Sequence, residues 1–366
     1  YGSNILAIVI LEDCIVEIAM ENTFCTYLLL FLVTDKVMTA SENSGADNTI
    51  ILRNKREAAY CKDRYKQWPE HSMCLPRKSQ IVGQTDQREI VRVHNMYRSN
   101  VTPPAEDMVK LDWDEELADI AQRWADNCKI THDTNAQRLI PGRFPVGQNI
   151  ASSPLSLTWP KVIELWYNET TSFQYGISTD LLKIGHFTQL IWASTHLVGC
   201  AVSVCSQTYF YVCNYGPGGN DGNLGTPYKS GTSCARCKRC SDNLCDCGDL
   251  VCLNGGVLNT TSCSCSCNVG VAFYEANDCR LNCTLGTDHQ ACGTSSFTAN
   301  TCSTNMGTVQ YCPELCKVCP YAGIDYKDKD TGSHKDSGKG SESTAGGIAI
   351  LPVFIVLLAI VALVTT

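Results

Sequence analysis

The sequence contains few basic residues and no unusual excess of apolar ones. It has 29 Lys and Arg against 37 Asp and Glu, which gives a formal net charge of −8. A general nucleic-acid binder presents a basic face, so this charge balance argues against that class of protein. Hydrophobic residues make up 44% of the chain, a moderate share that excludes a membrane protein with many spans.

The sequence also lacks the local signatures of common hydrolases. It contains no Gly-x-Ser-x-Gly nucleophile elbow and no His-Glu-x-x-His metalloprotease motif. Ser and Thr are plentiful, but nothing in the sequence marks one of them as an activated nucleophile. These absences favour a binding function over catalysis.

Cysteine, in contrast, is abundant and unevenly placed. The chain has 24 cysteines, and a density of this kind is typical of oxidised, extracellular proteins, because cytosolic thiols stay reduced. Sixteen of them lie between Cys234 and Cys319, whereas six lie between Cys61 and Cys213. We therefore expect one domain with a proper apolar core, followed by a tail that is held mainly by disulfides.

The N-terminal part of the chain contains a candidate secretory signal. An apolar run at residues 24–33 follows Met20, and small residues stand at Ala40 and Ser41. This pattern predicts a signal peptide over residues 20–41, with residues 1–19 as doubtful upstream sequence. The alternative is a short buried helix.

The C-terminal part predicts attachment to a membrane. Residues 348–364 are an apolar run of 17, whereas a spanning helix needs about 20 residues and usually a basic flank. We expect residues 348–366 to be a glycosylphosphatidylinositol (GPI) signal tail behind a polar stalk at 321–347. The alternative is a single span. The candidate attachment residues are Ser337, Gly338, Gly340 and Ser341.

Helices and strands are expected together in the middle of the chain. Asp86 and Glu89 form a capping-box-like helix start, and a second helix opens at Asp112 or Asp114. Residues 159–173 have the spacing of a third helix, and residues 209–213 are rich in β-forming side chains. The sequence therefore predicts an α+β domain of about 140 residues.

Five motifs stand in a fixed order within this domain. They are His94-Asn95-x-Tyr97-Arg98, Leu111-x-Trp113-x-x-x-Leu117-Ala118, Gly147-Gln148-Asn149-Ile150-Ala151, Gly185-His186-Phe187-Thr188-Gln189-Leu190 and Tyr211-Val212-Cys213-Asn214-Tyr215. Together they resemble the CAP superfamily, which includes cysteine-rich secretory proteins, venom allergens and plant pathogenesis-related proteins. The resemblance implies a three-layer α-β-α sandwich over residues 85–228. It also implies the disulfides Cys61–Cys74, Cys128–Cys205 and Cys200–Cys213. A further bridge of vertebrate members is missing here, because its two positions carry Val146 and Gly216.

The resemblance also points to a cleft. Matched by motif, the cleft residues of the family are His132, Gln148, Glu169 and His186. Two imidazoles and a carboxylate suit zinc or another divalent cation, so His132, Glu169 and His186 are candidate metal ligands. Gln148 takes the place of an acid, which weakens a metal site and leaves Glu169 as the one general base. The alternative is that these histidines are structural, which we also expect for His94, whereas His196 is expected at the surface.

The cysteine-dense tail divides into three sets. Four cysteines form a hinge that resembles those of invertebrate CAP proteins, and disulfides are favoured there over zinc. The next six resemble an EGF-like module and the last six a ShK-toxin-like one, although Gly307-Thr308 replaces the Lys-Tyr pair of the channel-blocking toxins. The expected order is an N-terminal hook (42–84), the CAP domain (85–228), the hinge (229–246), the EGF-like module (247–282) and the ShK-like module (283–320).

Together these features predict an extracellular protein on the outer face of the plasma membrane. Asn100, Asn259 and Asn282 are glycosylation sequons, and Asn168 is a fourth that lies beside Glu169. The leading function is non-catalytic binding of a lipid, a sterol or an extracellular protein, with no required cofactor and no nucleic acid. The alternatives are a weak metal-dependent hydrolase or a purely adhesive protein.

Overall fold

The computed structural model describes residues 61–319, except residues 69, 81, 268–276 and 286–287. The predicted signal peptide, stalk and GPI tail lie outside the described residues. Within the described part of the chain, none of the helices has the length and apolar character that a membrane span requires.

A four-stranded sheet forms the centre of the domain, in the order β1-β3-β4-β2. Strands β3 (Leu197–Cys205) and β4 (Thr208–Gly216) make an antiparallel hairpin. Strand β2 (Gly147–Ser153) pairs antiparallel with β4, and the short β1 (Asp112–Trp113) pairs parallel with β3. The hairpin strands are rich in Val, Tyr and Phe, side chains that pack well on a pleated surface.

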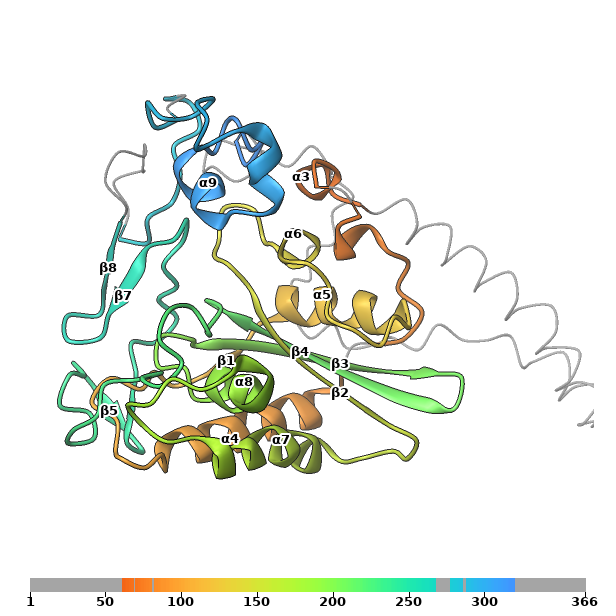
Figure 1. Cartoon of the computed structure of the whole chain (residues 1–366), viewed down its shortest axis with the longest axis vertical. Helices are drawn as coiled ribbons and strands as arrows, with labels where there is room; N and C mark the ends of the chain where they lie inside the picture. Colours follow the sequence, from red (N-terminus) through yellow and green to blue (C-terminus); the bar gives the residue numbers. More distant parts are fainter. Residues whose placement is uncertain (1–60, 69, 81, 268–276, 286–287, 320–366) are drawn as a thin grey trace, which may run out of the picture. The chain divides into compact units, whose positions relative to one another are not determined.

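Both faces of the sheet are covered by helices (Figure 1). On one face lies α5 (Glu115–Asp126), whose Trp124 packs in a cluster with Phe210 and Val212 of β4. On the other face lie α4 (Gln84–Ser99), α7 (Trp159–Tyr167) and α8 (Leu181–Leu190). Successive strand residues point to opposite faces of the sheet. Tyr211 and Tyr215 of β4 therefore pack in a second apolar cluster, with the helices α4, α7 and α8.

The helix boundaries correct two of the expectations. Helix α4 starts at Gln84 behind Gly83 and has no side-chain cap, so the capping box at Asp86 and Glu89 is wrong. The third helix ends at Tyr167 and continues as the 3-10 turn η2 (Asn168–Ser172). Of the two starts expected for the second helix, Asp114 is the cap, because its carboxylate accepts the Leu117 N–H at 2.8 Å.

The N-terminal segment is fastened onto α5. It contains α3 (Asp63–Lys66) and η1 (Ser72–Cys74), and the disulfide Cys61–Cys74 closes it. The carboxylate of Asp126, buried at the end of α5, accepts the backbone N–H groups of Lys78 and Ser79 at 2.7 and 2.9 Å. A buried carboxylate that accepts backbone donors holds the incoming chain in one place.

The position of the missing family bridge is filled by an aromatic ring. Gly147 pairs with Tyr215, so the neighbouring Val146 and Gly216 fall opposite each other at the ends of β2 and β4. A Cβ atom added at Gly216 would lie 2.1 Å from Cε2 of Phe144. Packing of the Phe144 ring therefore takes the space that a side chain at position 216 would need.

Beyond Tyr228 the chain is held by disulfides that close locally. The hinge contains β5 (Cys240–Ser241) and β6 (Leu244–Cys245), the next segment contains β7 (Val257–Asn259) and β8 (Ser264–Ser266), and the last contains η3 (Ala299–Ser303) and α9 (Met306–Tyr311). Every cysteine in the described residues is paired. The tail pairs are Cys234–Cys240, Cys237–Cys245, Cys247–Cys263, Cys252–Cys265, Cys267–Cys279, Cys283–Cys319, Cys292–Cys312 and Cys302–Cys316.

Candidate functional site

A cleft of about 900 Å³ opens where the start of β2 meets α8. His132, Gln148 and His186 all line it, so the structure brings together three of the four residues that the sequence predicts. Residues 218–221, which follow β4, line it as well. Gly147 is required here, because a Cβ atom at this position would lie 2.0 Å from Oε1 of Gln189.

His132 reaches the cleft from the segment between α5 and α6 (Asn135–Arg138). Its Nδ1 atom lies 2.8 Å from Oε1 of Gln148. Since an amide oxygen can only accept, Nδ1 carries the proton and Nε2 keeps the lone pair of the neutral ring. Partial burial lowers the pKa of His132, which keeps the imidazole neutral near physiological pH.

The amide of Gln148 is oriented by its other partners. Its Nε2 atom donates to Oδ1 of Asn214 at 3.1 Å, and the side chain also hydrogen-bonds Asp133. Asp133 is buried and paired with Arg138, whose Nη1 lies 2.7 Å from Oδ1. Burial raises the pKa of this carboxyl group even beside the guanidinium. Asp133 is thus a buried acid next to the cleft that sequence reasoning missed.

His186 is oriented from behind by Glu169. Its Nδ1 atom lies 2.6 Å from Oε1 of Glu169. The other ring nitrogen, Nε2, makes no hydrogen bond to the described residues. The carboxylate of Glu169 also accepts the backbone N–H groups of His186 and Phe187 at 2.8 and 3.1 Å. Trp166 stacks beside His186, with the ring centroids 6.3 Å apart.

Glu169 does not line the cleft, and its position changes the chemistry expected of it. Both carboxylate oxygens are engaged, one by the imidazole and the other by two backbone N–H groups. A general base must reach a proton of the substrate or of water. In this arrangement Glu169 positions His186 and is not directed at the cleft.

The cleft does not assemble a metal centre of three protein ligands. Among the residues that the structure describes, no group of three or more His, Cys, Asp and Glu side chains is placed to hold a metal ion. His132 and His186 would be the two nitrogen ligands, with Gln148 and Glu169 as the partners that fix their tautomers. Two imidazoles with no third protein ligand do not fit the three- or four-ligand sites of zinc.

The remaining histidines and the sequons take clear positions. His94 is buried on α4, with Nδ1 at 2.8 Å from the Ile90 carbonyl and Nε2 at 3.0 Å from the Tyr215 hydroxyl, so it is structural. The expectation for His196 is wrong, because its side chain is buried beside β1 and β3. Asn100, Asn168 and Asn259 are exposed and Asn282 is half-buried.

Comparison with known proteins identifies relatives of this chain. The model of the "Cysteine-rich secretory protein family" (CAP) matches residues 91–215. The chain is 39% identical over 241 residues to "Cysteine-rich venom protein Mr30" of Conus marmoreus, an alignment that covers 63% of this chain and 79% of that protein. It is 34% identical over 252 residues to "Cysteine-rich venom protein" of Conus textile, which covers 63% of this chain and 80% of that protein.

Among solved structures, the chain aligns with "Crystal structure of NaASP2 with Zn2+" at 25% identity and a TM-score of 0.41. This alignment covers 46% of this chain and 99% of that one. The sequence relatives carry the assignment, since more than three quarters of each of them is aligned with this chain. The chain belongs to the cysteine-rich secretory protein (CAP) family.

Proposed function

We propose that this protein is an extracellular binding protein that holds its ligand in the cleft between His132 and His186 and carries out no covalent chemistry. One observation supports this most directly: the one carboxylate that was expected to act as a base is already engaged. Glu169 is held by three hydrogen bonds, and Gln148 stands where an acid would provide a second base. Without a free carboxylate to act as its base, the cleft favours binding over the metal-dependent hydrolysis considered above.

The ligand that best fits this cleft is a protein segment. The lining contains amide side chains, which match the hydrogen-bonding groups of a polypeptide backbone. Leu181 and Leu182 stand at its rim with 49% and 90% of their surface exposed. Exposed apolar side chains beside amide side chains are typical of a protein-binding surface.

We propose further that the chain has the domain order expected from its sequence. Helices on both faces of the sheet support the three-layer sandwich (Figure 1). Each six-cysteine set closes on itself, which supports an EGF-like module at 247–282 and a ShK-like module at 283–320. The venom proteins among its relatives and the many disulfides support secretion, and the apolar C-terminal run supports a GPI anchor.

Selection of a random peptide library on the secreted full-length chain tests the proposed function. We expect selected peptides to lose at least tenfold in affinity for Leu182→Asp and for His186→Ala, because both residues line the cleft. Leu155→Asp is the matched control, since Leu155 is also exposed, at 70%, and does not line the cleft.

Two results would overturn the proposed function. One is binding to cholesterol-containing vesicles that His186→Ala abolishes while no peptide is selected, which would assign the cleft to a sterol. The other is turnover of a protein substrate that is lost in Glu169→Gln, which would restore the hydrolase alternative.

A further inference from the structure

We infer that the segment of residues 283–319, which we term the six-cysteine module, is a fixed wall of the cleft. A ligand held between His132 and His186 would then also contact Thr304 and Asn305 of this module. The second statement rests on the proposed function, whereas the first concerns the fold alone.

The six-cysteine module is closed internally by its disulfides. Cys283–Cys319 joins its ends, and Cys292–Cys312 and Cys302–Cys316 cross-link its interior. Such a module needs little apolar core of its own. It nevertheless buries Val309 and Val318, which are 8% and 1% exposed.

These valines are buried against residues of the CAP domain and the N-terminal segment. Val309 and Val318 belong to one apolar cluster with Trp68 and Leu139, which are 4% and 3% exposed. Trp68 follows α3, and Leu139 follows α6. Four buried apolar side chains from three separate stretches of the chain make this a docked interface, because its apolar surface would reach water if the module separated.

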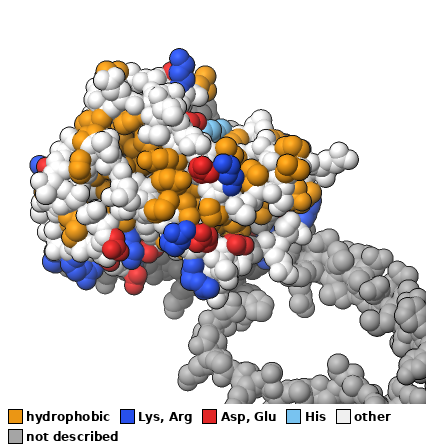
Figure 2. Space-filling view, turned by 90° about the horizontal axis from the view of Figure 1, so that it is seen from below, with side chains coloured by type: hydrophobic (Ala, Val, Ile, Leu, Met, Phe, Trp, Pro, Cys, Tyr) orange, Lys and Arg blue, Asp and Glu red, His pale blue; other side chains and the backbone are white. Residues whose placement is uncertain are grey.

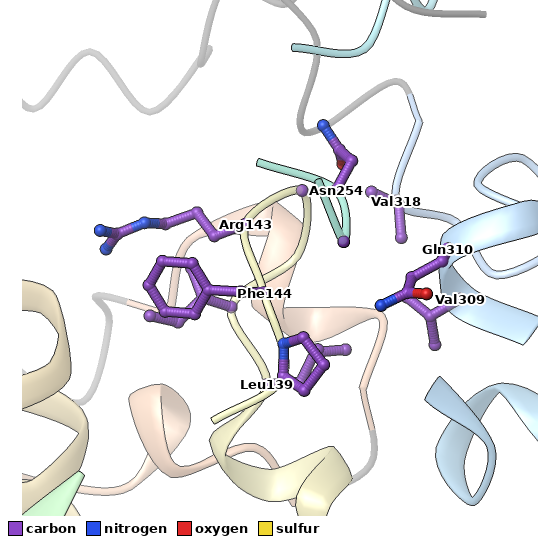
Figure 3. A pocket seen from close by; sticks show the side chains of 11 residues that line it. Leu139, Arg143, Phe144, Asn254, Val309, Gln310 and Val318 are labelled. Carbon is purple, nitrogen blue, oxygen red and sulfur yellow. The ribbon is translucent and has the colours of Figure 1, made fainter. Parts of the chain in front are cut away.

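A second contact closes the junction from the EGF-like side (Figure 3). Leu139, Asn254, Val309 and Gln310 surround a cavity of about 20 Å³, which leaves room for about one water molecule. Gly255 has a φ of +74°, and a Cβ atom there would lie 2.5 Å from Cδ of Gln310. The close approach at a glycine-specific conformation shows that these two tail segments are packed together as well.

The docked module reaches the cleft through one loop. Thr304, Asn305 and Gly307 line the same cleft as His132 and His186. The loop is held in place, because Cys302 is tied to Cys316 and Oδ1 of Asn305 accepts the Gly307 N–H at 2.9 Å. Loop residues that are fixed in this way can determine which ligands fit the cleft.

The position that a free channel blocker of this type would use is closed within the module itself. Thr308 stands in the place of a toxin residue that follows the methionine, and it is fully buried. Its hydroxyl lies 3.0 Å from that of Thr301, within the module. The six-cysteine module therefore works within this chain, as part of the cleft.

The chemistry of the wall narrows the ligand class. Thr304 and Asn305 are neutral hydrogen-bonding side chains, and they face a cleft lined by Gln148 and Asn149. Groups that can both donate and accept match the alternating N–H and C=O groups of an extended polypeptide. We therefore assign to the cleft an extended segment of a protein partner.

The docking statement is tested without any ligand. In the secreted full-length chain, Val318→Asp and Leu139→Asp each put a charge into the apolar junction, and Leu285→Asp is the control because Leu285 is 60% exposed on the same module. The readout is the rate at which diethyl pyrocarbonate modifies His132 and His186, together with hydrogen exchange over residues 132–149. Intact disulfides, checked by mass spectrometry, show that the module itself is still folded.

We expect at least a threefold faster modification and faster exchange in both junction variants, with no change in Leu285→Asp. Unchanged rates in Val318→Asp and Leu139→Asp, with all disulfides intact, would overturn the inference. Two independent variants, one on each side of the junction, guard against misfolding of either part.

The ligand statement is tested with the library-selected peptides. Asn305→Ala is expected to weaken their binding about fivefold, roughly the effect of one lost hydrogen bond, whereas Asn300→Ala, exposed on the same module but outside the cleft lining, is expected to leave it unchanged. Equal binding by Asn305→Ala and the wild type would overturn the statement. If the junction variants expose the histidines but no peptide binds, the proposed function is wrong and the docking statement holds. If peptides bind but the junction variants change nothing, the docking statement is wrong.

Discussion

At the scale of single residues, Gln148 places a neutral amide between His132 and the buried acid Asp133. Its amide accepts from His132 and donates to Asn214, and it also hydrogen-bonds the buried acid Asp133. A carboxylate could accept from His132 but could not donate to the other two. The amide at this position and the acid at 133 therefore form a compatible pair.

Gln148→Glu tests this compatibility. We expect the pKa of His132 to rise by about one unit, because a carboxylate in direct contact favours the imidazolium form. We also expect a lower melting temperature, since the new carboxylate faces Asp133 and loses its donor role. The pKa is measured by NMR titration of His132, with His289 as an internal reference.

Asn135→Asp is the control for this variant, because it adds the same charge at an exposed position of the cleft rim. It should raise the pKa of His132 by less than Gln148→Glu does. A pKa of His132 that is the same in Gln148→Glu and in the wild type would show that the hydrogen bond between His132 and residue 148 does not determine the protonation state of the ring.

At the scale of secondary-structure elements, Arg98 joins α4 to the rest of the domain. Its side chain is 1% exposed and donates to the backbone carbonyls of Val109, Leu190, Trp192, Ala193 and Thr195. Carbonyl groups that turn away from helices and strands need such a donor when they are buried. The Arg98 guanidinium thus satisfies the buried carbonyl groups of two irregular segments. One contains Val109 and precedes β1, and the other joins α8 to β3.

Arg98→Met is expected to lower the free energy of unfolding by about 3 kcal/mol or more, because several buried carbonyls would lose their partner at once. Chemical denaturation monitored by circular dichroism measures the loss. Arg88→Met is the matched control on the exposed side of the same helix and should cost less than about 0.5 kcal/mol. Similar losses in the two variants would contradict this role of Arg98.

The elements that the sequence predicted well are those with a local signal. The cap at Asp114 and the run of β-forming residues at 209–213 both correspond to elements of the structure. The segment 181–190 gave no such signal, because α8 carries Leu181 and Leu182 on its exposed side and its apolar residues therefore have no clear helical period. Tertiary contacts decide the form of this helix.

The candidate site was predictable where a local motif identifies a residue. The family motifs identified His132, Gln148 and His186, which line one cleft. They did not show that Glu169 lies behind His186, nor that Asp133 and Asn305 belong to the surroundings of the cleft. These contacts connect residues that are far apart along the chain, and no local pattern encodes them.

At the scale of the whole molecule, three buried histidines tie stability to pH. His71 lies in the N-terminal segment, His94 on α4 and His196 beside the sheet, and burial lowers the pKa of each to about 4. In the unfolded chain each would titrate near 6.5. Between these two values the unfolded state binds protons that the folded state does not, so stability falls as the pH drops from about 6.5 to about 4.

We therefore expect the melting temperature of the secreted chain to be level above pH 7 and to fall steadily between pH 6.5 and pH 4.5, with disulfides intact. Burial also raises the pKa values of Asp107, Asp112 and Asp133. Their effect has the opposite sign, because the folded state takes up these protons at a higher pH than the unfolded chain does. Differential scanning calorimetry between pH 6.5 and pH 5 measures the net effect of the histidines and these carboxyl groups.

His94→Gln separates one histidine from the others. An amide can replace the donor to the Ile90 carbonyl and the acceptor for the Tyr215 hydroxyl, but it cannot take up a proton. The variant should lose stability at pH 7.5, because the ring leaves a poorly filled space, yet its melting temperature should fall less between pH 6.5 and pH 5 than that of the wild type. His289→Gln, which changes a half-buried histidine outside the domain core, should keep the full slope. A slope that is equally steep in His94→Gln and the wild type would show that the pH dependence comes from other groups.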